Sequence, residues 1–133
     1  MVMILSLVLA SCSGPNRSQS PSSASGFEIV VTASPNTLRG ATPASGESQG
    51  GCAVIQMTVF DQQGRLVDGA RVTVTTTLGR FPGATAGEEF VAVTGFTIRG
   101  ILTEALCAKA ERGTAIVTAS TENAVATVRI TIF

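Results

Sequence analysis

Short runs in which every second residue is apolar fill most of the sequence after residue 26, and this pattern restricts the fold most. In the segment 53–61, for example, Ile55, Met57 and Val59 fall on one face of an extended chain. A period of two is the period of a β-strand, whereas a helix repeats its apolar positions about every 3.6 residues. The sequence therefore predicts an all-β domain over residues 27–133.

Seven segments carry this alternation, and residues that favour turns separate them. They are 27–33, 53–61, 65–77, 90–99, 101–108, 113–119 and 124–133. Seven short strands at such spacing predict a sandwich of two sheets. We expect 53–61 and 65–77 to form a hairpin about the turn Asp61-Gln62-Gln63-Gly64. For 101–108 the sequence does not decide which alternate residues point inward, because one choice exposes a Leu and the other buries Glu104.

The N-terminus is an apolar run over residues 1–10 that changes abruptly to small and polar residues. As a helix of eleven residues this segment is about 16 Å long, roughly half the thickness of a bilayer core, so we interpret it as an export signal. Leu9-Ala10-Ser11-Cys12 resembles the lipobox of bacterial lipoproteins. The resemblance implies a signal peptide over 1–11, cleavage before Cys12, and acylation of the Cys12 thiol. The alternative is a frayed apolar terminus with a chance cysteine.

Residues 12–26 are predicted to be the acylated Cys12 and a flexible tether, because Ser, Gly and Pro dominate 13–26. Fourteen such residues reach a root-mean-square distance of about 20 Å. No Lys or Arg precedes the apolar run, so we expect translation to begin further upstream. The lipobox implies the cell envelope, and Ser13 after the cysteine implies the outer membrane if the bacterium is diderm.

Composition excludes several classes of function. Nine basic and nine acidic residues cancel, which argues against a nucleic-acid partner. The chain has no His, the usual general base and the commonest metal ligand, so we expect neither an enzyme nor a cofactor or metal. A serine nucleophile would need Lys109, the only lysine. Calcium ligation is the alternative for the acidic residues of the predicted loops, but turns and solvated loops explain them better. These residues are Asp61, Asp68, Glu88 and Glu89.

The segment from Asp61 to Val74, with sequence DQQGRLVDGARVTV, resembles the hairpin of the bacterial immunoglobulin-like domain of intimin and invasin adhesins. Thr77-Leu78-Gly79, Gly100 and the segment 113–120 agree with later parts of the same module. The resemblance covers residues 27–133. It implies an immunoglobulin-like sandwich that acts as a spacer or interaction module at the cell surface, and it implies no ligand.

Two cysteines, Cys52 and Cys107, lie in the predicted domain of an exported chain. In an immunoglobulin-like sandwich the start of the second strand lies near the end of its antiparallel neighbour. We therefore predict a disulfide between them. Two buried free thiols are the alternative.

The leading hypothesis is a non-catalytic, lipid-anchored envelope protein whose single immunoglobulin-like domain is a structural or protein-interaction module. We expect a monomer. The alternative is an adhesin-like surface protein that binds a host or neighbouring-cell partner through loops 39–51 and 79–89. A third interpretation is an accessory subunit or fragment of a larger adhesin.

Overall fold

The structure, a computed structural model, describes residues 26–85, 87–122 and 124–133. The predicted signal peptide with Leu9, Ala10 and Ser11, the predicted acylation site Cys12, and the tether up to residue 25 lie outside the described residues, so they stay predictions. Within the described part of the chain, no helix combines the length and apolar character needed to cross a membrane.

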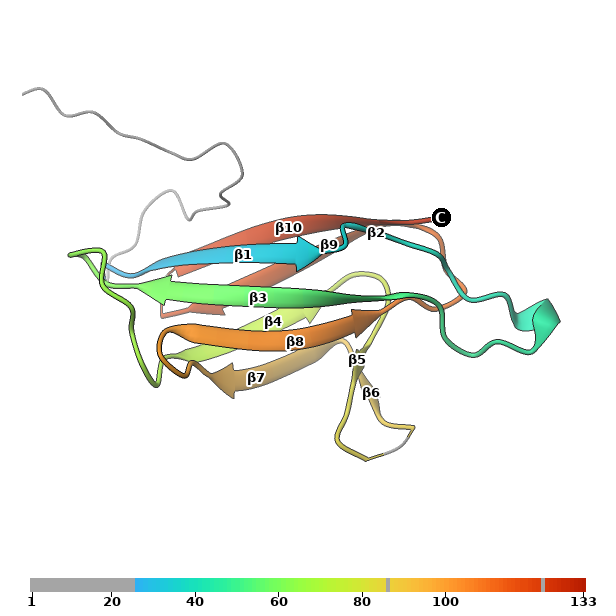
Figure 1. The fold of residues 1–133 in the computed structure, drawn as a ribbon, viewed down its shortest axis with the longest axis horizontal. Coiled ribbons are helices and arrows are strands. Elements are labelled where there is room, and N and C mark those ends of the chain that lie inside the picture. Colours follow the sequence, from blue (N-terminus) through green and yellow to red (C-terminus); the bar gives the residue numbers. More distant parts are fainter. Residues whose placement is uncertain (1–25, 86, 123) are drawn as a thin grey trace, which may run out of the picture.

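Two sheets stack face to face (Figure 1). The first contains β1 (Glu28–Ser34), β3 (Cys52–Phe60) and β8 (Ile101–Cys107), in the order β1-β3-β8. The second has the order β2-β10-β9-β4-β7, with β2 (Thr37–Leu38), β10 (Ala124–Ile132), β9 (Gly113–Thr121), β4 (Arg71–Thr76) and β7 (Ala92–Phe96). Each of the seven longer strands overlaps one of the seven predicted segments, although β4 and β7 are shorter than predicted, and the two sheets confirm the immunoglobulin-like sandwich.

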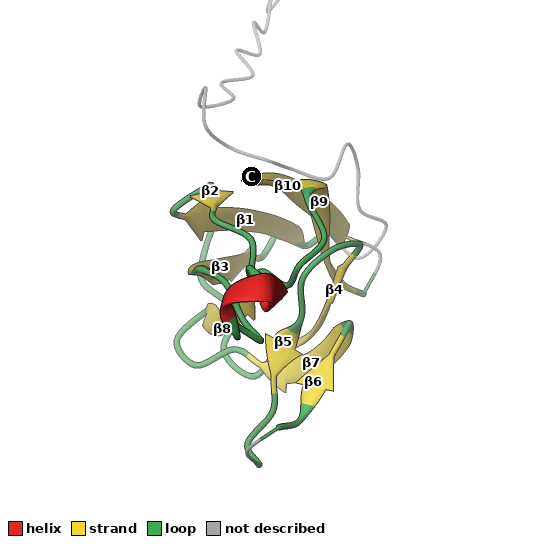
Figure 2. Ribbon diagram, turned by 90° about the vertical axis from the view of Figure 1, so that its right-hand side faces the viewer, coloured by secondary structure: helices red, strands yellow, loops and turns green. Residues whose placement is uncertain are grey.

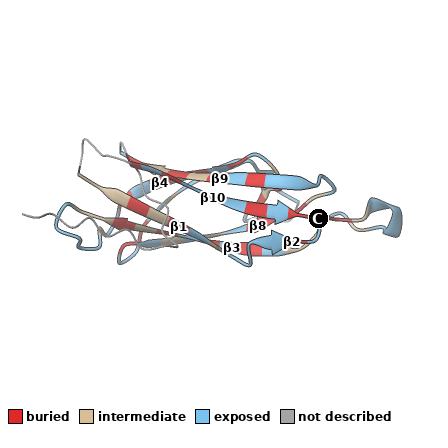
Figure 3. Ribbon diagram, turned by 90° about the horizontal axis from the view of Figure 1, so that it is seen from above, coloured by how far each residue is buried: buried red, intermediate tan, exposed pale blue. Residues whose placement is uncertain are grey.

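The core lies between the sheets, and Figure 3 marks in red the buried residues along the strands of both sheets. Each strand contributes alternate side chains, because successive residues of a strand point to opposite faces. The alternation in the sequence predicts the inward residues of four strands: Ile55, Met57 and Val59 in β3, Val72 and Val74 in β4, Ala115, Val117 and Ala119 in β9, and Ala126, Val128, Ile130 and Ile132 in β10. All of them are buried except Val128, which is half-buried. The register was thus correctly predicted in these four strands.

The connections gather at two ends of the sandwich. We call the end formed by Gly26 and residues 61–70 and 97–100 the tether end, and the end formed by residues 35–51, 77–91 and 108–112 the loop end. The strands run between these ends, as Figure 1 shows. The last residue, Phe133, lies at the loop end, where its carbonyl accepts a bond from the Gly40 N–H at 2.7 Å.

The predicted hairpin of 53–61 with 65–77 is wrong beyond its turn, because β3 and β4 belong to different sheets. Both edges of β3 are already paired, with β1 and with β8. Residues 61–70 therefore cross the tether end after a short pairing of Phe60 with Leu66. Buried Thr97 fixes the crossing, since its hydroxyl donates to the Val67 carbonyl at 2.6 Å and accepts from the Ala70 N–H at 2.8 Å.

The structure shows which residues of β8 face the core. Leu102, Glu104 and Leu106 face inward, and β8 is an edge strand of its sheet. The Glu104 side chain is half-buried and makes no hydrogen bond or ion pair with any residue that the structure describes. Loss of water around the carboxyl raises the pKa of Glu104 above its ordinary value. An inward charge on an edge strand also discourages pairing with another chain.

We expect Glu104→Gln to stabilise the domain at neutral pH. The raised pKa means that folding disfavours the ionised form, so this cost is present at neutral pH and disappears as pH falls below the pKa of the carboxyl. Urea unfolding should show a higher midpoint for Glu104→Gln at neutral pH, and the difference should shrink in acid. Glu111→Gln, which removes the same charge from an exposed position, is the control. Equal midpoints for Glu104→Gln and wild type at neutral pH would contradict this account.

Candidate functional site

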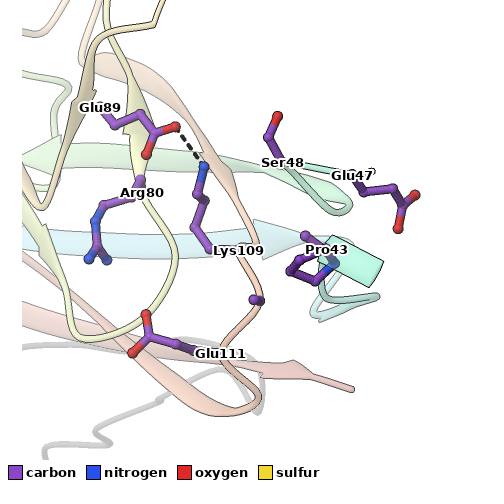
Figure 4. Close-up of a pocket in the computed structure, with 9 residues that line it drawn as sticks. Pro43, Glu47, Ser48, Arg80, Glu89, Lys109 and Glu111 are labelled. Carbon is purple, nitrogen blue, oxygen red and sulfur yellow. Dashed lines mark hydrogen bonds and ion pairs between the residues drawn. The ribbon is translucent and has the colours of Figure 1, made fainter. Parts of the chain in front are cut away.

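The two predicted binding loops, 39–51 and 79–89, meet at the loop end of the sandwich. Together with residues 109–111 they line an open pocket of about 390 Å³ (Figure 4). The lining residues are Ala41, Pro43, Glu47, Ser48, Arg80, Glu89, Lys109, Ala110 and Glu111. Sequence reasoning missed the contribution of 109–111, because nothing in that segment shows which loops lie beside it.

A disulfide lies beside this pocket. Cys52 and Cys107 face each other in the antiparallel pair of β3 and β8, and their Sγ atoms are 2.07 Å apart, so the predicted disulfide is present. The Cys107 N–H donates to the Arg80 carbonyl and the Arg80 N–H donates to the Cys107 carbonyl, both at 2.9 Å. The bridge therefore connects β3, β8 and the start of loop 79–89.

Loop 39–51 is held by its own charged residues. It contains a short 3-10 helix, η1 (Pro43–Ser45), at the loop end (Figure 2). The Arg39 guanidinium donates to both carboxylate oxygens of Glu47, at 2.6 and 3.2 Å. These bonds, with a 2.9 Å bond from the Thr42 N–H, lower the pKa of Glu47 to about 2. Glu47 thus stays ionised at neutral pH, and its carboxylate bonds to residues of its own loop.

An ion pair crosses between the other two segments. Lys109 Nζ lies 2.7 Å from Glu89 Oε1 (Figure 4). The Arg80 guanidinium donates to the Gly79 carbonyl at 2.6 Å and forms no ion pair with a described residue. Glu111 is exposed and has no side-chain partner among the described residues. The pocket therefore presents an unpaired cation and an unpaired anion, an arrangement suited to a polar segment of a protein.

A small arm projects beside the pocket (Figure 2). It is the antiparallel pair β5 (Phe81–Pro82) and β6 (Glu89–Phe90). The sequence predicts a loop over 79–89 and a strand from Phe90 onward, but the structure pairs Phe81 with Phe90, and fully buried Phe81 fixes this arm to the core. Its partner Phe90 is 42% exposed, and the next residue, Val91, is also exposed. Aromatic residues, including Phe, and Arg are enriched at protein interfaces relative to the rest of the surface.

The four acidic residues considered for calcium do not come together. Asp61 accepts from the Arg65 and Gln63 N–H groups, bonds that lower the pKa of its carboxyl, and Asp68 accepts from the Arg99 N–H. Both lie at the tether end, whereas Glu88 and Glu89 lie at the loop end. Among the described residues no cluster of three His, Cys, Asp or Glu side chains is suited to a metal.

No protein-family model and no curated protein matches the sequence. Solved structures that match the fold include the following two. Adhesin InvE of Yersinia pseudotuberculosis has 19% identity and a TM-score of 0.58 over 92% of this chain. A C-terminal 282-residue fragment of intimin, in complex with the intimin-binding domain of the translocated intimin receptor, has 19% identity and a TM-score of 0.52 over 77% of this chain. The chain has the intimin/invasin-type immunoglobulin-like fold. It spans 29% of the InvE structure and 31% of the intimin fragment, so the likeness concerns one intimin/invasin-type module.

Proposed function

We propose that this protein is a non-catalytic, lipid-anchored protein of the cell envelope whose intimin/invasin-type domain binds another protein through its loop end. The observation that carries this proposal is the opposite placement of two features. Gly26, the first described residue, packs against the Gln62 side chain at the tether end, whereas loops 39–51 and 79–89 meet at the other end. Strands of seven to nine residues separate the ends by roughly 20 to 30 Å.

This placement suits a binding module on a tether. A chain anchored through Cys12 and residues 13–26 would hold the tether end toward the bilayer and present the loop end away from it. The disulfide and the ion pairs Arg39–Glu47 and Lys109–Glu89 fix the loops before any partner arrives. Loops ordered in advance lose less conformational entropy on binding, which favours affinity.

Intact mass of the membrane-extracted protein tests the anchor. We expect a chain that begins at Cys12 and carries added acyl mass, and we expect Cys12→Ala to remain unprocessed and unacylated. An unmodified wild-type chain that retains residues 1–11 would overturn the anchor while leaving the loop-end site open to test.

A photo-crosslinking amino acid tests the binding site in intact cells. We expect a discrete adduct with one protein when the probe replaces Phe90, which is 42% exposed at the loop end. The matched control is Val125, which is 43% exposed on β10. The Arg80→Ala substitution should reduce the adduct at position 90. Equal or absent adducts at both positions would contradict a loop-end site.

An adhesin that binds a host or neighbouring-cell protein is the second candidate. Its support is the shared fold with adhesin InvE and with the intimin fragment. Protease added to intact cells distinguishes the two candidates, because a surface adhesin is cleaved at once. A periplasmic module is cleaved only after the outer membrane is opened.

A further inference from the structure

We propose that the tether end docks on the lipid bilayer through an apolar tip formed by Leu66, Phe96, Ile98 and Ile101. This inference rests on the proposed function, because the anchor at Cys12 brings the bilayer close to this end. Docking would fix the orientation of the domain and direct the loop end away from the membrane.

The tip exposes large apolar side chains where a soluble domain usually has polar ones. Ile98 is 73% exposed and Leu66 is 52% exposed, and Phe96 and Ile101 are also exposed. Phe96 and Ile98 lie on either side of buried Thr97 in the sequence. Because successive side chains of an extended chain point to opposite faces, both point away from the core that buries Thr97. Ile98 and Ile101 face each other across the turn that joins β7 to β8.

The tip is rigid because both of its segments are bonded to the domain. Ile98 and Ile101 exchange two backbone hydrogen bonds, at 2.9 and 3.1 Å, around Arg99 and Gly100. Both residues of this turn have positive φ, 54° and 86°, as a tight two-residue hairpin turn requires. Leu66 packs directly on Gly100. Any larger residue at position 100 would place its Cβ atom only 2.7 Å from the Leu66 Cβ, so the contact requires glycine. Apolar side chains held in this way lose little entropy when they enter lipid.

The position of Gly26 identifies the bilayer as the occupant. Gly26 packs against the side chain of Gln62, which belongs to the crossing 61–70, so the described chain begins at the same end of the domain as the tip. From there the predicted tether of residues 13–26 has a root-mean-square reach of about 20 Å to Cys12. The tether therefore keeps the tip near the acyl chains, and its local concentration at the bilayer is high.

Apolar contact drives the docking, because the charges at this end nearly balance. Arg65 adjoins Leu66 and Arg99 adjoins Ile98, as in interfacial segments that place apolar groups in lipid and basic groups among phosphates. The charged residues here are Arg65, Arg71 and Arg99 against Glu28, Asp61, Asp68 and Glu122. We therefore expect docking on neutral phosphatidylcholine with little dependence on salt.

Tryptophan fluorescence tests the proposal, because the chain contains no Trp or Tyr. The full chain is linked through its Cys12 thiol to vesicles of phosphatidylcholine that carry a maleimide lipid, so the tether exists whether or not cells acylate Cys12. We expect brominated phosphatidylcholine to quench about half of the emission of Ile98→Trp, because quenching requires contact with the acyl region. Adding Leu66→Ser to this variant should at least halve the quenching.

The control is Phe133→Trp, which places the reporter at the loop end on a side chain that is 62% exposed in the wild type. Its emission should stay unquenched on the same vesicles. Equal quenching at both positions, or none at position 98 while the protein stays attached, would overturn lipid docking. A blue shift of Ile98→Trp that rises with protein concentration without vesicles would also overturn it, because the tip would then contact a second copy. Failure of acylation in cells overturns only the natural anchor, which the mass measurement reports separately.

Discussion

Reduction of the Cys52–Cys107 disulfide is expected to lower the free energy of unfolding by about 4 kcal/mol. The bridge joins residues 55 positions apart, and in the chain-entropy description a loop of this length restricts the unfolded chain by about that amount. For a domain of this size the loss corresponds to a fall in Tm on the order of 20 °C. Thermal unfolding with and without reductant measures the effect.

The Cys52→Ser, Cys107→Ser double variant is the control for this measurement. It should unfold at the low temperature of the reduced wild type, and reductant should change its Tm no further. The Cys52 side of the bridge is exposed and Cys107 is buried, so reductant has access to one sulfur without prior unfolding. If reductant left the wild-type Tm unchanged, the two thiols would be free in solution and the alternative interpretation of these cysteines would hold.

The strands were predictable from the sequence because their burial follows a period of two. Met57 and Val74 illustrate this, since each sits in an uninterrupted alternation and each is fully buried. The pairing partners were less accessible, because alternation shows which face is buried but not which strand lies alongside. The crossing at residues 61–70 shows the difference, since β4 has the predicted facing but lies in the other sheet.

The candidate site was partly predictable for the same reason. Loops 39–51 and 79–89 stand out as long connections between strands, the first rich in Gly, Ser and Ala and the second in Gly and Ala, and loops of a rigid scaffold are common binding surfaces. Their meeting at one end, and the part played by Lys109, follow from the order of strands in space. The facing of Glu104 could not be predicted, because the alternation places it inward whereas its charge favours an outward position. An edge strand tolerates an inward charge that a central strand would exclude, and the sequence does not show that β8 is an edge strand.

Phe81→Ala is expected to cost about 3 to 5 kcal/mol of folding free energy, because it removes a large, fully buried side chain and leaves a cavity. Its cross-strand partner gives a matched control. Phe90 is 42% exposed, so Phe90→Ala should cost less than about 1 kcal/mol although it deletes the same atoms from the same arm. Urea unfolding of the two variants measures the difference.

The comparison also separates stability from binding at the loop end. Phe81 anchors the arm but lies in the core, whereas Phe90 faces solvent beside the pocket. Phe90→Ala should therefore weaken partner binding while the fold stays intact, and Phe81→Leu, a milder truncation, should lower stability by less than Phe81→Ala. Similar free energies of unfolding for Phe81→Ala and Phe90→Ala would show that Phe81 is not a core residue in solution. The arm would then be a flexible loop, and a loop-end site prepared in advance for its partner would lose its structural basis.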